Sequence, residues 1–153
     1  MLRLSKKADY ALIAMKHLAQ KQDATSASAR EIAGAYDIPN ELMAKVLQKL
    51  VRTGLLRSLQ GTRGGYVLGK ASRMITVGDI IEAIDGPFSV TACSTEKTTC
   101  EQYGKCSIRD PLWRIKELIV AALGTVSLAV MAAETDQPLP AMPMPAAFLR
   151  THV

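Results

Sequence analysis

The side chains best suited to chemistry are the three cysteines of the chain, Cys93, Cys100 and Cys106, which share one polar segment. Serine, threonine, glutamate, lysine and glycine surround them, without the helical or strand period of packed residues. Thiolates on such a loop suit an iron-sulfur cluster, which normally takes four protein ligands. Their odd number disfavours a closed set of disulfides, and the spacing lacks the C-x2-C pair of structural zinc sites. The segment predicts a metal or cluster site, with redox-reactive or incidental thiols as the alternative.

The length and charge of the chain indicate what kind of protein carries this segment. The 153 residues suffice for one compact core, or for a small domain with an appended helix. Residues 1–73 carry 13 Lys/Arg against 5 Asp/Glu, whereas residues 74–153 carry 6 against 9, so the first part suits a polyanionic partner. The uncharged run from Leu118 to Ala133 is too short to span a membrane, and no signal peptide is evident. We expect a cytoplasmic protein with reduced thiols.

The basic part of the chain predicts a helix-turn-helix. Ser5 caps a helix with one apolar face, Ser28 begins a short second helix, and Pro39 ends it. The third helix places Met43, Val46, Leu47, Leu50 and Val51 on one face. Its polar face matches a recognition helix for the DNA major groove, although a solvated amphipathic helix is the alternative. The candidate contacts are Asn40, Glu41, Ala44, Lys45, Gln48 and Lys49.

A β-hairpin follows this third helix. Residues 55–59 and 66–68 predict two strands, joined by the glycine-rich turn Gln60-Gly61-Thr62-Arg63-Gly64-Gly65. Such a hairpin would form the wing of a winged helix, with Gln60, Thr62 and Arg63 placed at a phosphate or in the minor groove. A nucleotide-binding loop is poorly supported because no G-K-[ST] follows. An ordinary hairpin turn is the other alternative.

The rest of the chain predicts two helices on either side of the cysteines. Thr76 begins a helix that Gly86 and Pro87 end. Asp110 as cap and Pro111 in the first turn begin a long helix to Ala133. The second half of this helix is apolar on nearly every face. A chain of this length buries such a helix most simply against the same helix of a second copy, in a twofold dimer. We therefore expect a winged helix-turn-helix domain (1–73), a linking helix and cysteine loop (74–109), a dimerisation helix (110–134) and a disordered tail (135–153).

Five features together resemble the Rrf2 family of bacterial transcription regulators, over about residues 1–133. They are the opening Leu4-Ser5-Lys6-Lys7-Ala8-Asp9-Tyr10-Ala11, the turn from Gly61 to Lys70, the segment from Ile75 to Ile81, the cysteines, and Pro111-Leu112-Trp113. The opening and the cysteine spacing most resemble the branch that regulates the SUF iron-sulfur assembly system. The resemblance implies a homodimer, mainly α with a small β-hairpin wing, that binds a palindromic operator in double-stranded DNA with an affinity that depends on a cluster.

The resemblance also bears on the cluster ligands. IscR- and NsrR-type members hold a cluster with three cysteines and a fourth ligand, but the first cysteine gap here is one residue longer, and Arg109 stands where some members have histidine. The cluster type favoured is therefore 2Fe-2S, with 4Fe-4S also possible. An aspartate at the matching position of NsrR makes Asp9 of the partner subunit the candidate fourth ligand. Alternatively, Asp9 only stabilises the N-terminus of its helix, as a carboxylate in the first turn does without any metal. Glu96 or Glu101 would then be the next candidate for the fourth ligand.

Two rival functions remain at the level of sequence. An enzyme or a small iron-sulfur electron carrier is disfavoured, because only His17 and His152 offer imidazole bases and neither lies beside a candidate nucleophile. The second rival is a winged-helix regulator whose cysteines act as a thiol redox or nitric oxide switch rather than as cluster ligands.

Overall fold

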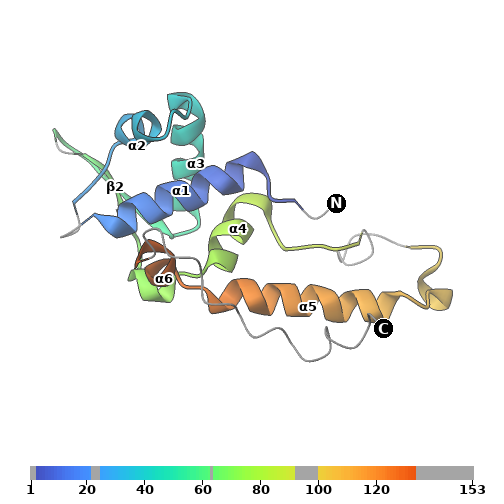
Figure 1. The fold of residues 1–153 in the computed structure, drawn as a ribbon. Coiled ribbons are helices and arrows are strands. Elements are labelled where there is room, and N and C mark those ends of the chain that lie inside the picture. Colours follow the sequence, from blue (N-terminus) through green and yellow to red (C-terminus); the bar gives the residue numbers. More distant parts are fainter. Residues whose placement is uncertain (1–2, 22–24, 63, 92–99, 134–153) are drawn as a thin grey trace.

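The computed structural model describes residues 3–21, 25–62, 64–91 and 100–133. The elements in chain order are α1 (Lys6–Gln20), α2 (Ala29–Ala35), α3 (Asn40–Arg52), β1 (Leu56–Leu59), β2 (Gly65–Leu68), η2 (Ser72–Met74), α4 (Val77–Asp85), η4 (Tyr103–Lys105), α5 (Arg109–Thr125) and α6 (Leu128–Ala133). Figure 1 shows a compact half containing α1 to α4 and α6, from which α5 extends as an arm. The expected fold class, mainly α with a small antiparallel hairpin, is confirmed.

Side-chain caps fix where three of these helices begin. The Ser5 hydroxyl accepts the backbone N–H of Ala8 at 3.1 Å, and the Ser28 hydroxyl accepts that of Glu31 at 3.1 Å. Thr76 and Asp79 form a reciprocal capping box at the start of α4. Each cap satisfies backbone donors that lack a partner in the first turn of a helix. The three expected helix starts at Ser5, Ser28 and Thr76 are therefore confirmed.

The hydrophobic core lies where α1 crosses the other helices. Ala8, Ala11 and Ala14 of α1 are fully buried, and such small side chains let neighbouring helices approach closely. The larger buried side chains around them come from α3, α4, α6 and the segment before α4: Met43, Leu47, Leu50, Ile75, Ile80, Ile84 and Leu128. This packing holds the polar face of α3 outward.

The hairpin is anchored by a pairing that the sequence did not predict. Its register joins Leu56 to Leu68 and Leu59 to Gly65. Ala27, which lies between the first two helices and in no element expected from the sequence, exchanges backbone hydrogen bonds of 3.1 and 2.9 Å with Tyr66. A Cβ on Gly65 would lie 2.7 Å from the Ala27 carbonyl oxygen, so the close approach requires glycine.

The expectation of one continuous helix from Asp110 to Ala133 was wrong. The helix ends at Thr125, and the chain turns so that Val77 N–H donates to Val126 O at 2.9 Å and Leu128 N–H donates to Ile75 O at 2.7 Å. The Ser127 hydroxyl then accepts Val130 N–H at 3.3 Å and starts α6. Leu128 is completely buried. Part of the apolar character that we attributed to a dimer contact is therefore explained by burial in the chain's own core.

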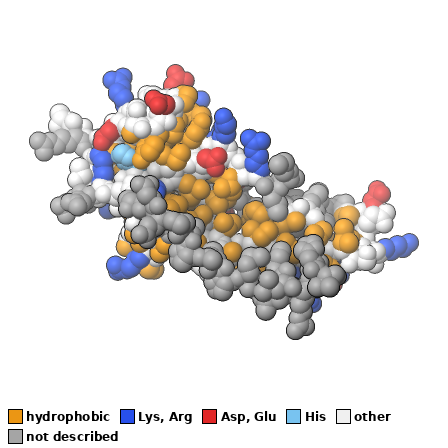
Figure 2. All heavy atoms as spheres, in the orientation of Figure 1, with side chains coloured by type: hydrophobic (Ala, Val, Ile, Leu, Met, Phe, Trp, Pro, Cys, Tyr) orange, Lys and Arg blue, Asp and Glu red, His pale blue; other side chains and the backbone are white. Residues whose placement is uncertain are grey.

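The arm α5 retains an apolar surface. Trp113, Ile115, Leu118 and Val120 are each between 44 and 53% exposed, and Figure 2 shows hydrophobic side chains over α5 and the helices next to it. Asp110 does not cap α5 as expected, because the helix begins at Arg109 and the Asp110 carboxylate accepts a 2.7 Å hydrogen bond from Arg109 Nε. None of the helices in the described ranges is long and apolar enough to cross a membrane. The tail from residue 135 lies outside the described residues.

Candidate nucleic-acid interface and cysteine segment

The outward face of α3 carries most of the side chains proposed from the sequence. Asn40, Glu41, Lys45 and Gln48 are exposed, and Ala44 is half-buried. The opposite face, with Met43, Val46, Leu47 and Leu50, is buried against α1 and α2. The helix therefore presents amide, carboxylate and ammonium groups together on one side, which are the groups that contact base edges and phosphates.

The hairpin follows α3 in the chain, and its first strand, β1, packs against α3. Gln60 and Thr62 are exposed, and Gly61 has a φ of +111°, which a side chain would strain. Arg63, the expected phosphate or minor-groove contact, lies outside the described residues. Figure 1 shows the hairpin projecting from one side of the compact half, while β1 contacts α3 and β2 contacts α1.

Lys49 has a different partner from the one expected. We expected Lys49 to contact DNA, but its Nζ donates a hydrogen bond to the carbonyl oxygen of Ile84 at the end of α4. Carbonyls at a helix C-terminus lack partners within the helix and attract cations. Lys49 therefore ties α3 to α4, whereas Lys45 projects from α3 without such a tie to the described part of the chain. Sequence reasoning missed that Lys6 and Lys7 of α1 line the same depression as Lys45.

The described part of the cysteine segment is ordered around Arg109. Cys100 and Cys106 are half-buried free thiols on either side of η4. Arg109 Nη1 donates to the Tyr103 carbonyl oxygen at 3.3 Å, and the guanidinium carbon lies 4.7 Å from the centre of the Tyr103 ring. The pKa of Arg109 is raised mainly by its hydrogen bond to Asp110 and, less strongly, by Cys106. A permanent positive charge is thus held near the Cys106 sulfur.

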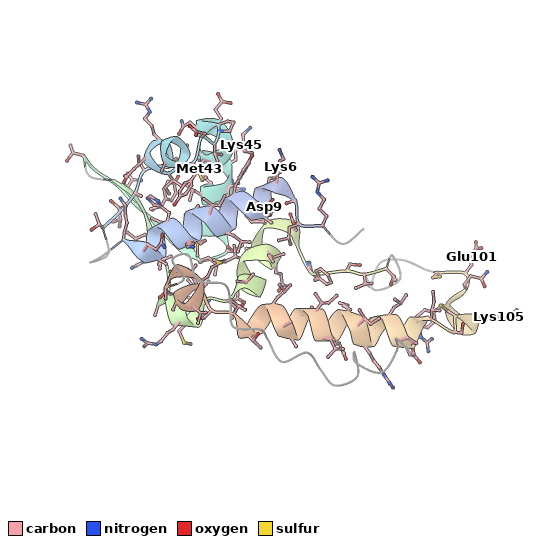
Figure 3. The ribbon with its side chains drawn as sticks, viewed as in Figure 1. Lys6, Asp9, Met43, Lys45, Glu101 and Lys105 are labelled. Atoms are coloured by element: carbon pink, nitrogen blue, oxygen red, sulfur yellow. The ribbon has the colours of Figure 1, made fainter. Side chains whose placement is uncertain are left out.

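The donor chemistry fits an iron-sulfur cluster in part. Two unpaired thiols flank a short turn beside a cation, and iron-sulfur clusters are bound by thiolates. Cys93 lies outside the described residues, and within them no three His, Cys, Asp or Glu side chains gather closely enough to hold a metal. Asp9 is exposed on the first turn of α1, and Figure 3 shows it far from Glu101 and Lys105 of the cysteine segment. Within the described residues, one chain therefore does not bring Asp9 to Cys100 or Cys106.

His17 is placed as a packing residue and not as a base. Its Nδ1 lies 3.1 Å from the Tyr36 hydroxyl, and the two rings meet edge to face at 5.6 Å. Burial lowers the pKa of the imidazole, as does the nearby Lys21 ammonium, while Glu31 opposes them. His17 lies at the contact of α1 with the C-terminal end of α2, and His152 lies outside the described residues.

Comparisons with known proteins agree on one family. The family model Rrf2, described as an iron-dependent transcriptional regulator, matches residues 4–134. The HTH-type transcriptional regulator CymR of Bacillus subtilis (strain 168) is 29% identical over 136 residues, which cover 88% of this chain and 93% of CymR.

Solved structures give the same result. B. subtilis CymR, described as the global cysteine regulator of that organism, matches with a TM-score of 0.75 at 31% identity and covers 89% of this chain and 100% of its own. The oxidized form of Staphylococcus aureus CymR matches at 0.68 and 26% identity, over 89% and 100% of the two chains. IscR from T. potens matches at 0.67 and 27% identity, over 90% and 94%.

Proposed function

The chain belongs to the Rrf2 family of transcriptional regulators, and we propose that it binds double-stranded DNA with α3 in the major groove and the β1–β2 hairpin against the backbone. The observation that carries this proposal is the division of α3 into a buried apolar face and an exposed face with Asn40, Glu41, Lys45 and Gln48. A helix held this way by two others, with a hairpin beside it, is the docking unit of winged-helix regulators. Membership in a regulator family also makes this chain a regulator and not an enzyme.

The side chains divide into two roles on DNA. Asn40, Glu41 and Gln48 carry oriented amide or carboxylate groups, which suit hydrogen bonding to base edges in the major groove. Lys45 supplies a flexible charge that suits phosphate. Gln60, Thr62 and Arg63 at the hairpin turn would contact the backbone or the minor groove, and Ala44 offers a methyl group to a thymine methyl.

The binding unit in this proposal is a homodimer on a palindromic operator. Trp113, Ile115, Leu118 and Val120 are exposed apolar side chains on α5 that one chain does not cover in its described part. Burying such side chains against a second copy is favourable at roughly 25 cal/mol per Å² of apolar area. A twofold pair of recognition helices requires a twofold DNA site, because each half-site meets one copy of α3.

We propose further that Cys93, Cys100 and Cys106 hold an iron-sulfur cluster, 2Fe-2S in preference to 4Fe-4S. A bound cluster supplies a group that is sensitive to iron supply and to oxidants. The protein would supply three thiolates, and the positive charge of Arg109 lies within electrostatic reach of Cys106. Asp9 of the partner subunit is the proposed fourth ligand. This is consistent with its exposure on α1 and its distance from the described part of the cysteine segment in its own chain. On this basis the regulated genes would include those of SUF cluster assembly.

A thiol switch is the second candidate for control of the same DNA-binding unit. Cys100 and Cys106 are free and partly accessible, so both thiols are open to oxidation. The similarity to CymR, described as a global cysteine regulator in one species and solved in an oxidized form in another, supports this candidate as much as IscR supports a cluster.

Selection from a random pool of DNA duplexes tests the binding function. Protein purified without oxygen is mixed with the pool, and the bound fraction is amplified and sequenced over several rounds. We expect an enriched motif with twofold symmetry, whose half-sites are separated by about one helical turn. Failure to enrich any motif, with or without iron, would contradict the proposed function.

A further inference from the structure

A lysine-rich depression lies where the start of α1, the middle of α3 and the end of α4 meet. We refer to it as the lysine pocket and define it by Ser5, Lys6, Lys7, Lys45, Lys49 and Asp85, which line an open hollow of about 550 Å³. Figure 3 shows Lys6 and Lys45 projecting to the same side of the molecule from two different helices. The pocket thus gathers four ammonium groups around one carboxylate.

The carboxylate and one of the lysines are already used within the fold. Asp85 accepts the Ser5 hydroxyl at 2.6 Å through Oδ1 and the Ser5 N–H at 3.3 Å through Oδ2. Lys49 donates to the Ile84 carbonyl oxygen. Among the described residues, Lys6, Lys7 and Lys45 have no hydrogen-bond or ion-pair partner. Three free cations that converge on one hollow repel one another, so an anion bound there would relieve the repulsion.

The position of the pocket identifies the source of the anion. In Figure 1 the hairpin tip and the start of α1 lie on opposite sides of α3. A helix in the major groove has a sugar-phosphate backbone on each side, and the hairpin reaches only one of them. The other strand would then pass the start of α1, where Lys6 and Lys7 stand beside Lys45.

We propose that the lysine pocket binds a phosphate of the DNA backbone on the side of α3 opposite the hairpin. The proposal rests on the DNA-binding function and adds α1 to the interface. Lys6, Lys7 and Lys45 supply the charge, while the Ser5–Asp85 and Lys49–Ile84 hydrogen bonds hold the three helices in register around it. Lys49 serves as a structural tie and makes no phosphate contact.

The salt dependence of DNA binding tests this site. The affinity for a random-sequence duplex of about 30 base pairs is measured by fluorescence anisotropy over roughly 50 to 200 mM salt, for the full chain and for a Lys6→Ala/Lys7→Ala variant. The logarithmic salt slope should fall by about 0.9 for each phosphate that the variant no longer neutralises.

The matched control is Lys105→Ala/Arg114→Ala, which removes two exposed charges from η4 and α5 and should leave the slope unchanged. Figure 3 shows Lys105 far from Lys6 and Lys45. Thermal melting checks that both variants fold.

The outcomes separate this proposal from the function on which it rests. If the unaltered protein binds the duplex and both variants share its slope, the lysine pocket is overturned while DNA binding stands. If the unaltered protein binds no duplex at all, the proposed DNA-binding function itself is contradicted. An NMR titration distinguishes the source of the anion. The amide signals of residues 5–7 should shift when the duplex is added. If inorganic phosphate alone, at the same concentration as the duplex, saturated the same shifts, the pocket would be a free phosphate site and the assignment to DNA would be overturned.

Discussion

Ser5 and Asp85 are joined by two hydrogen bonds across 80 residues of sequence, one from the Ser5 hydroxyl at 2.6 Å and one from its N–H at 3.3 Å. The same hydroxyl accepts the Ala8 N–H and so caps α1. The start of α1 and the end of α4 are therefore fixed by one serine. Because Lys49 of α3 bonds to Ile84 at the same end of α4, three helices of the DNA-binding half meet at this point.

Replacing Asp85 by alanine should lower the stability of the fold. The substitution leaves the Ser5 hydroxyl without its acceptor, and at an exposed position the loss should be about 1 kcal/mol. For a chain of this size that corresponds to a fall in Tm of roughly 2–4 °C. The control is Glu82→Ala, which removes a carboxylate from an exposed position of the same helix. Equal melting temperatures for the two variants would show that the Ser5–Asp85 contact contributes nothing.

Replacing Leu128 by alanine tests the return of the chain from α5 into the core. Leu128 is fully buried, so its loss should cost about 2–5 kcal/mol in the free energy of unfolding. Val130 of the same helix is 47% exposed, and Val130→Ala should cost less than about 1 kcal/mol. Urea unfolding followed by circular dichroism measures both. If Leu128→Ala cost no more than Val130→Ala, Leu128 would not be a core residue, and the continuous helix that the sequence predicts would be supported instead.

The Gly65→Ala variant tests how the hairpin is held. Its Cβ would meet the Ala27 carbonyl at 2.7 Å, so the bridge between Ala27 and Tyr66 must open, at roughly 1–3 kcal/mol. DNA affinity should fall with it because the hairpin loses its anchor. Gly34→Ala is the control, since its added methyl group meets nothing within 4 Å and lies in α2. If the Gly65→Ala variant kept full DNA affinity, DNA binding would not depend on the anchoring of the hairpin by Ala27.

Gln48 and Lys45 should affect DNA binding in different ways. Gln48→Ala should relax the preferred base at one position of each half-site by about 1–3 kcal/mol while leaving the salt slope unchanged. Lys45→Ala should weaken binding to all sequences and reduce the slope by about 0.9. Affinities for the selected operator and its single-base variants, each at several salt concentrations, measure both effects. If the two variants show the same pattern, the division between base and phosphate contacts is wrong.

Local signals in the sequence were sufficient for most helices of the fold. Ser5, Ser28 and Thr76 each combine a hydroxyl cap with a following apolar period, and the structure begins a helix after each of them. The exposed face of α3 follows from the same period. These features depend on residues only three or four positions apart, which a sequence displays directly.

Contacts between distant residues were not predictable in this way. Residues 128–131 would be apolar whether a partner subunit or α1 covered them, so the spacing of apolar residues did not reveal that Leu128 enters the core. The helical position of Lys49 places it outward but does not indicate that Ile84 lies within its reach. The pairing of Ala27 with Tyr66 and the meeting of Lys6 with Lys45 likewise depend on how the helices cross.

The two candidates for control make different predictions for the cysteines. With a cluster, Cys93→Ala, Cys100→Ala and Cys106→Ala should each abolish bound iron while leaving the secondary structure intact, because the described cysteines lie outside the core. With a thiol switch, the unaltered protein would be colourless, and a disulfide-forming oxidant alone would change its DNA affinity.

The most direct measurement is the affinity for the selected operator before and after cluster loss, made on protein purified without oxygen and assayed for iron and sulfide. We predict that the protein carries both, and that removing them changes the Kd by roughly 5- to 150-fold, the usual range of coupling between two sites. Cys106→Ala should carry neither and should show no response. A protein without iron or sulfide, whose operator affinity is the same in reducing and oxidising buffer, would contradict control through the cysteine segment.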